Sequence, residues 1–131
     1  MSRATTALRL VARTLLLWLL TGLGLAAGVF GAFFHGWLVP LGLLVSLVGL
    51  AAVLALAMAV TSSRSGPALA AVGWFLAVLV LSAARPEGDV VVDGTATGYG
   101  YLLLGSVLAT GSLVVSTLYA VGLVGGPDLR A

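Results

Sequence analysis

The chain alternates between four long apolar runs and short polar stretches. Each run is close to the length of about 20 residues that an α-helix needs to cross the hydrocarbon core of a bilayer. The pattern predicts membrane spans at about residues 14–34, 37–60, 67–84 and 98–124. The predicted fold class is therefore an all-α membrane protein, a four-helix transmembrane bundle formed by a single integral membrane domain over residues 1–131.

Composition supports lipid rather than water as the surroundings of this bundle. Hydrophobic residues make up 61% of the chain and charged residues only 8%, whereas a soluble domain carries about 25% charged residues. The absence of Cys excludes disulfides, thiolate metal sites and CxxC redox chemistry. We expect no cofactor and no metal, and we predict that the protein is not an enzyme.

The arginines predict which way the bundle faces. The inner segments would carry Arg3, Arg9, Arg13, Arg64 and Arg130. The outer segments would carry only Arg85, so the positive-inside rule places both termini in the cytoplasm. The pI of about 9.7 rests on these scattered arginines. We interpret them as a topology signal that contacts anionic lipid, and we expect no nucleic-acid partner.

Aromatic residues agree with this orientation because Trp and Tyr favour the membrane interfaces. The residues expected at the outer interface are Phe33, Phe34, Trp37, Tyr99 and Tyr101. Trp18 and Tyr119 are expected nearer the inner interface.

Small residues follow one face of each predicted span. At 100° per residue, four sets align: Gly24, Gly28, Gly31 and His35; Gly42, Ser46 and Gly49; Ala70, Gly73, Ala77 and Ala84; and Gly105, Ala109, Ser112 and Ser116. Small residues let helix backbones approach closely in lipid. We therefore predict a compact bundle rather than separate lipid-exposed helices.

The fourth span carries a second, polar stripe beside its small one, formed by Tyr99, Ser106, Thr110 and Thr117. The structural interpretation is that these hydroxyls bond to carbonyls of their own helix or across helices. The functional alternative is that Ser106, Thr110 and Thr117 line a path for a small polar solute. No charged residue lies within a predicted span, and ion-coupled transport usually needs one.

His35 is the one histidine, at the outer end of the first span. It is a candidate titratable group for a proton or a metal. The alternative is an ordinary helix-end residue at the interface.

The longest predicted loop, residues 85–98, is the only substantial polar surface. Its Val90–Val92 run, an Asp93-Gly94 turn and a second run at Thr95–Thr97 predict a short extracellular hairpin. The charged residues of this loop are Arg85, Glu87, Asp89 and Asp93. Three carboxylates could supply part of a divalent cation site, although their spacing fits no EF-hand. We favour a solvated loop that faces a partner.

Four features of the chain occur together: the four spans, the basic N-terminus, the segment Arg85-Pro86-Glu87-Gly88-Asp89-Val90 and the Gly-Tyr-Gly-Tyr of residues 98–101. In this combination the chain resembles a family of small membrane proteins from high-GC Gram-positive (actinobacterial) bacteria. The absence of Lys, Asn, Gln and Ile is typical of a GC-rich genome. This family has no established activity. The resemblance implies a multi-pass protein of the bacterial plasma membrane and no reaction.

We therefore expect a non-enzymatic accessory or structural protein that presents the outer loop to another membrane or envelope protein. Its other partners would be the lipid bilayer and possible further copies of itself. The alternative from a different class is a small oligomeric channel or transporter component. A membrane enzyme that uses the outer carboxylates is a more distant third.

Overall fold

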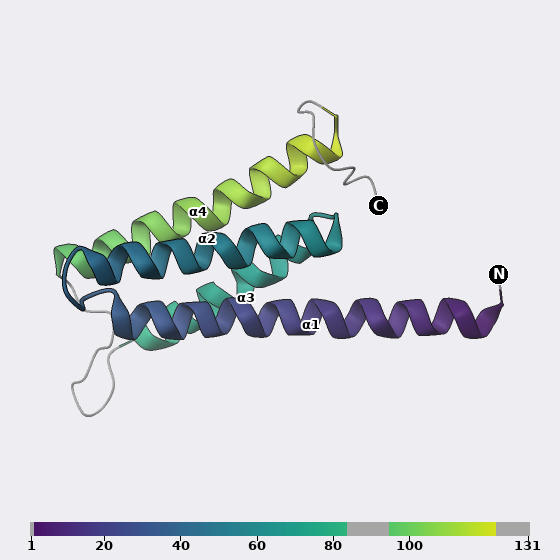
Figure 1. The fold of residues 1–131 in the computed structure, drawn as a ribbon, viewed down its shortest axis with the longest axis horizontal. Coiled ribbons are helices and arrows are strands. Elements are labelled where there is room, and N and C mark those ends of the chain that lie inside the picture. The colour runs from purple at the N-terminus through teal and green to yellow at the C-terminus, as the bar shows by residue number, and fades with distance from the viewer. Residues whose placement is uncertain (1, 84–94, 123–131) are drawn as a thin grey trace.

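The computed structural model describes residues 2–83 and 95–122. Within these ranges the chain forms four α-helices: α1 (Arg3–Phe34), α2 (Leu41–Thr61), α3 (Ser65–Ser82) and α4 (Ala96–Ala120). Figure 1 shows α2 and α4 running side by side, with α1 along the opposite edge and α3 behind. Successive helices run in opposite directions (Figure 1), so the bundle has two ends. We name them the His35 end and the Arg13 end after the α1 residues found there.

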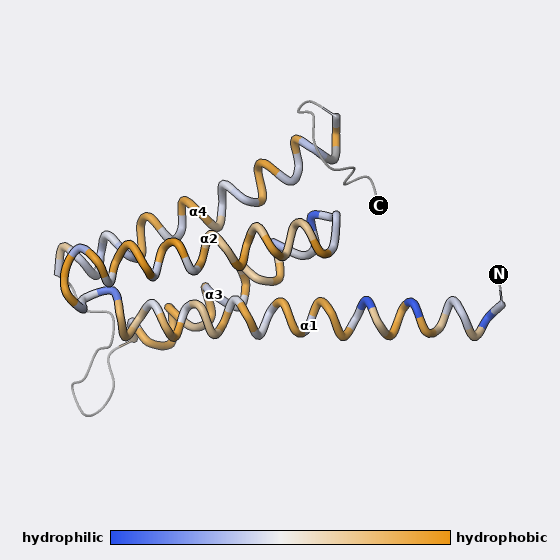
Figure 2. The backbone as a smooth tube through the Cα atoms, in the orientation of Figure 1, coloured by the Kyte–Doolittle hydropathy of each residue, from blue (hydrophilic) through white to orange (hydrophobic). Residues whose placement is uncertain are grey.

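All four helices in the described part of the chain are long and apolar enough to cross a membrane. Large apolar side chains such as Leu79, Leu103 and Val107 point outward along them. Figure 2 shows apolar colour over all helices, with hydrophilic stretches in the first part of α1 and in the turn between α2 and α3. These properties confirm the predicted all-α fold with four spanning helices and fit a multi-pass membrane protein.

Helix α1 begins well before the predicted span, which starts at about residue 14. Ser2 caps the helix, since its Oγ accepts a hydrogen bond from the Thr5 N–H. Its 32 residues make α1 about 48 Å long, against a hydrocarbon core of about 30 Å. The first turns therefore project beyond the bundle (Figure 1), and residues 2–15 are all exposed.

The connections at both ends also differ from the predicted boundaries. Residues 37–40 form a turn instead of the start of the second helix, with Leu38 in the left-handed region at φ 42° and a cis Val39–Pro40 bond. At the Arg13 end, Ser62 adopts a left-handed conformation that ends α2. Helix α3 follows three residues later, which places Pro67 in its first turn.

The predicted hairpin between α3 and α4 is wrong in its second strand. Thr95 caps α4, with its hydroxyl oxygen accepting from the Gly98 N–H, and Ala96 and Thr97 are already helical. A capping threonine followed by a long apolar run favours a helix start over a strand. The first strand and the Asp93-Gly94 turn lie outside the described residues.

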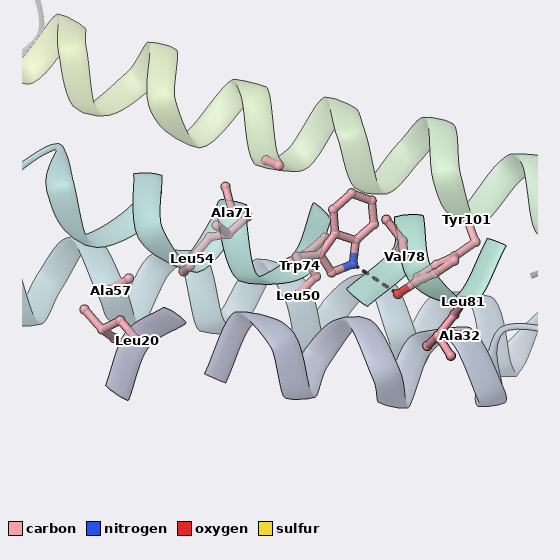
Figure 3. Packing of buried hydrophobic residues seen from close by; sticks show 12 residues of the cluster. Leu20, Ala32, Leu50, Leu54, Ala57, Ala71, Trp74, Val78, Leu81 and Tyr101 are labelled. Carbon is pink, nitrogen blue, oxygen red and sulfur yellow. Dashed lines mark hydrogen bonds between the residues drawn. The ribbon is translucent and has the colours of Figure 1, made fainter. Parts of the chain in front are cut away.

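Helix α1 packs mainly against α3, and α2 contacts α1, α3 and α4. The core combines residues from all four helices (Figure 3): Leu20 and Ala32 of α1, Leu50, Leu54 and Ala57 of α2, Ala70, Ala71, Trp74, Val78 and Leu81 of α3, and Tyr101 and Ala109 of α4. The small-residue faces predicted for α1, α3 and α4 are buried here, although Ser112 is only partly buried and Ala84 lies outside the described residues. Gly49 does not fit its predicted stripe, because no atom lies near the position of its absent Cβ.

Candidate functional site

The most polar feature inside the bundle is a chain of hydrogen bonds that links three helices. The indole Nε1–H of Trp74 on α3 donates to the Tyr101 hydroxyl oxygen on α4 over 3.0 Å. The Tyr101 hydroxyl donates in turn to the Gly28 carbonyl of α1 over 3.1 Å. Both aromatic side chains are fully buried, and Figure 3 shows the indole nitrogen and the hydroxyl pointing toward each other. Every polar atom of the pair is thereby satisfied, as burial in an apolar core requires.

His35 extends this cluster toward the His35 end. Its ring stacks on Tyr101, with centroids 5.3 Å apart and planes 10° apart, and the side chain is only 5% exposed. His35 Nδ1 lies 3.1 Å from the Gly31 carbonyl oxygen. Because a carbonyl only accepts, Nδ1 is the donor in this hydrogen bond. No hydrogen bond to Nε2 is formed by the part of the chain that the structure describes.

Three glycines make room for the aromatic rings. A Cβ at Gly31 would collide with the Tyr101 hydroxyl, and one at Gly105 with the Trp74 indole. A Cβ at Gly28 would lie 2.6 Å from Ala77 Cβ and 3.1 Å from the Trp74 carbonyl oxygen. The small-residue faces of α1 and α4 therefore serve two purposes here: they bring backbones together and they accommodate two large side chains.

Sequence reasoning missed this cluster. Tyr101 was predicted at a membrane interface, but its ring is buried between helices, while Tyr99 two residues earlier is 58% exposed. The available signal was Trp74 near the middle of a span, because a buried indole N–H requires an acceptor. The position of Tyr101 four residues before Gly105, on the small face of α4, was a second signal.

The hydroxyl stripe predicted on α4 does not face the interior. Ser106 Oγ donates to the Leu102 carbonyl over 2.6 Å, and Thr117 Oγ1 donates to the Leu113 carbonyl over 2.8 Å. Thr110 is exposed on the outside of the bundle. Ser106 and Thr117 thus bond to their own helix, as the structural interpretation predicts.

The charged residues of the predicted outer loop, Arg85, Glu87, Asp89 and Asp93, lie outside the described residues, so their arrangement is not part of this site. In residues 2–83 and 95–122, no group of three His, Cys, Asp or Glu side chains could hold a metal ion. The described cluster is thus an aromatic and hydrogen-bonded core with the His35 imidazole stacked on Tyr101.

Sequence comparison matches residues 2–126, nearly the entire chain, to the family described as "Family of unknown function (DUF6113)". The chain belongs to the DUF6113 family. The matched range includes all four helices described above and the whole His35–Tyr101–Trp74 cluster. No curated protein and no solved structure matches the chain. Membership in DUF6113 therefore assigns a family to this architecture without assigning it a reaction.

Proposed function

We propose that this DUF6113 protein is a non-enzymatic accessory or structural protein of a bacterial plasma membrane. The observation that carries the proposal is the filled centre of the bundle, where Trp74 and Tyr101 are fully buried and bonded to each other and to Gly28. A solute path needs a continuous polar lining, whereas a scaffold needs a solid core. The packing of this chain suits a scaffold.

In this proposal the scaffold presents the segment between α3 and α4, which carries the charges of the predicted outer loop, to another membrane or envelope protein. This segment follows α3 and leads into α4, and the Trp74–Tyr101 hydrogen bond joins these two helices. Function commonly resides in loops held by rigid elements. The charges available for recognition are Arg85, Glu87, Asp89 and Asp93.

The proposed orientation places both termini in the cytoplasm. The arginines in the described part of the chain, Arg3, Arg9, Arg13 and Arg64, belong to the Arg13 end of the bundle. The positive-inside rule assigns that end to the cytoplasm and the His35 end to the outside. A reporter fused after Ala131 should be active only if it folds in the cytoplasm. Activity restricted to an exported reporter at this position would reverse the orientation.

The partner role is tested by in vivo crosslinking followed by purification in mild detergent, with the crosslinked species identified by mass spectrometry. Glu87→Lys and Asp89→Lys should abolish a specific crosslinked heteromer. The matched control is Asp128→Lys, which reverses a charge near the C-terminus on the proposed cytoplasmic side. This variant should leave the crosslinked heteromer intact. Recovery of only the protein itself, as one defined oligomer unaffected by Glu87→Lys, would contradict the proposal.

One observation favours a second candidate, an oligomeric channel. Thr110 is exposed on the outward side of α4, on the same stripe as Ser106 and Thr117, so this stripe could line a path between copies. Thr110→Val and Thr117→Val should then reduce solute flux into proteoliposomes without changing the oligomer. The accessory role predicts no flux in either protein and unchanged partner crosslinking.

A further inference from the structure

A groove of about 450 Å³ runs along the outside of the bundle between α1 and α3. Its lining residues come from two helices: Thr14, Leu17, Trp18 and Thr21 of α1, and Leu69, Val72 and Leu76 of α3. The groove begins one residue after Arg13 and extends about 10 Å along the helix axes. Its volume falls within the range of small-molecule sites, about 300–1,000 Å³.

The groove is suited to an apolar occupant. Its two hydroxyl groups already donate to carbonyls of their own helix, Thr14 to Leu10 over 2.8 Å and Thr21 to Leu17 over 2.9 Å. Trp18 is 71% exposed along one edge. The rest of the lining is aliphatic, so nothing in the groove requires a polar ligand atom.

A polar group closes one end of this groove. Ser65, Leu69, Val72 and Leu76 follow one stripe of α3 at i, i+4, i+7 and i+11, so the apolar stripe leads to Ser65. Arg13 Nη2 donates to Ser65 Oγ over 3.2 Å and to Ser63 Oγ over 3.3 Å. The two serine hydroxyls are joined over 2.7 Å, and Ser63 is only 4% exposed. The guanidinium is thus held at the mouth of the groove.

Positive charge accumulates at this mouth, and the part of the chain that the structure describes has no carboxylate to balance it. Arg13 keeps donors to spare, because a guanidinium has five N–H groups and the two serines engage only Nη2. Ser2, Thr6, Arg9 and Arg13 lie on one face of α1, again at i, i+4, i+7 and i+11. Arg64 is exposed in the adjoining turn, and residues 2–83 and 95–122 contain no Asp or Glu.

We propose that this groove binds one anionic phospholipid. Its phosphate group is held by Arg13, with Arg9 and Arg64 adding positive charge, and one acyl chain lies between α1 and α3. A guanidinium pairs well with phosphate oxygens because its planar fork matches their geometry. A groove of about 10 Å also fits within one leaflet, which is about half of the 30 Å hydrocarbon core.

The charge distribution favours a lipid over a second copy of the chain. Two copies with the same orientation in the membrane would place their Arg9 and Arg13 side chains at the same depth. If α1 of one copy occupied the groove of the other, these like charges would lie close together and repel. An anionic headgroup would instead neutralise them, so the groove and the arginines can be satisfied together.

The test uses delipidated full-length protein in a neutral detergent and native mass spectrometry. The protein is titrated with dioleoylphosphatidylglycerol, with dioleoylphosphatidylcholine, and with glycerol 3-phosphate as a phosphate without acyl chains. We expect one phosphatidylglycerol to bind about tenfold more tightly than phosphatidylcholine. Glycerol 3-phosphate should not bind at the same concentrations, because it cannot fill the groove.

Three variants separate the headgroup from the acyl chain. Arg13→Gln should reduce phosphatidylglycerol affinity to the level of phosphatidylcholine, whereas Arg3→Gln, which removes the same charge from the far end of α1, should leave it within about twofold. Val72→Trp should fill the groove and weaken both lipids. Circular dichroism confirms that each variant is folded, and Leu69→Trp replaces Val72→Trp if that variant is not.

Several results would overturn the proposal. Equal binding of the two lipids would remove the role of the charge, and equal losses in Arg13→Gln and Arg3→Gln would replace the site with diffuse attraction. Unchanged affinity in a folded groove-filling variant would exclude the groove. A delipidated dimer that Val72→Trp dissociates would identify a second copy as the occupant.

Discussion

The Trp74 indole N–H and the Tyr101 hydroxyl form a hydrogen bond of 3.0 Å in the centre of the bundle. The rings also meet edge to face, with centroids 5.8 Å apart. Because the Tyr101 hydroxyl also donates a hydrogen bond to the Gly28 carbonyl, one side chain of α4 is bonded to α3 and α1 together. This single hydroxyl group therefore couples helices that are distant in sequence. Its removal should lower the stability of the whole bundle.

Replacement of Tyr101 by Phe should lower stability by about 1–3 kcal/mol. The ring and its stacking on His35 are retained, but the Trp74 N–H loses its acceptor, and a buried unsatisfied donor is costly. The measurement is the unfolding midpoint in detergent. The matched control is Tyr99→Phe, which removes the same atom from an exposed ring and should leave the midpoint unchanged. A similar midpoint for both variants would mean that the bond contributes nothing measurable.

Close approach of α1 and α3 gives a second prediction. A Cβ at Gly24 would collide with the Ala70 carbonyl oxygen, which belongs to the backbone and cannot rotate away. Gly24→Ala should therefore separate the helices and lower stability by about 1–3 kcal/mol.

Gly22 provides the matched control for this substitution, because no atom lies within 4 Å of its absent Cβ. Gly22→Ala should raise stability by about 0.5–1 kcal/mol, since Ala is the better helix former. We expect the two variants to change stability in opposite directions. The measurement is the unfolding midpoint of each variant in the same detergent. Equal shifts would show that the two helices do not approach as closely as the structure indicates.

The number of helices and the small-residue faces could be predicted from the sequence, because apolar length and helical period are local properties of the chain. Gly24, Gly28 and Gly31 were placed correctly on the packed face for this reason. Gly49 was not, since the 100° period says which residues share a face but not whether another helix reaches that part of it. In a chain so rich in glycine, some aligned glycines meet only lipid.

The aromatic cluster and the Arg13 site could not be predicted in the same way. Tyr101 and Gly28 are 73 residues apart, and their contact depends on how three helices are arranged around one another. The bonds of Arg13 to Ser63 and Ser65 likewise depend on the turn between α2 and α3 lying beside α1. The sequence predicts positive charge at this end, but only the packing places an apolar groove next to it.

Ser82 provides a third prediction. Loss of a hydrogen-bonded polar group lowers stability, but loss of the Ser82 hydroxyl should not. Among the residues that the structure describes, Ser82 Oγ is a buried side-chain atom with no hydrogen-bond partner. Its burial therefore costs free energy without a compensating bond. Ser82→Ala should keep or raise stability, by up to about 1 kcal/mol.

The control for this variant is Ser46→Ala. Ser46 is also buried, but its hydroxyl donates to the Gly42 carbonyl of its own helix over 2.7 Å, so its removal should lower stability by about 0.5–1.5 kcal/mol. Thermal unfolding of both variants in one detergent gives the comparison. A larger loss in Ser82→Ala than in Ser46→Ala would show that the Ser82 hydroxyl has a partner in the folded protein.

His35 gives the last prediction, because its two contacts can be removed separately. His35→Phe keeps an aromatic ring stacked on Tyr101 and loses the Nδ1 hydrogen bond to the Gly31 carbonyl. That carbonyl still accepts the backbone N–H of residue 35 over 2.8 Å, so no polar group is left unpaired. The cost should be about 0.5–1.5 kcal/mol, the net contribution of a typical intramolecular hydrogen bond. His35→Ala removes the ring as well and should cost more, by the value of one stacked pair, about 0.5–1.5 kcal/mol.

If the imidazole acts only in packing, His35→Phe should also preserve the crosslinked partner complex. A stable His35→Phe protein that loses this complex would instead assign a functional role to the imidazole of His35.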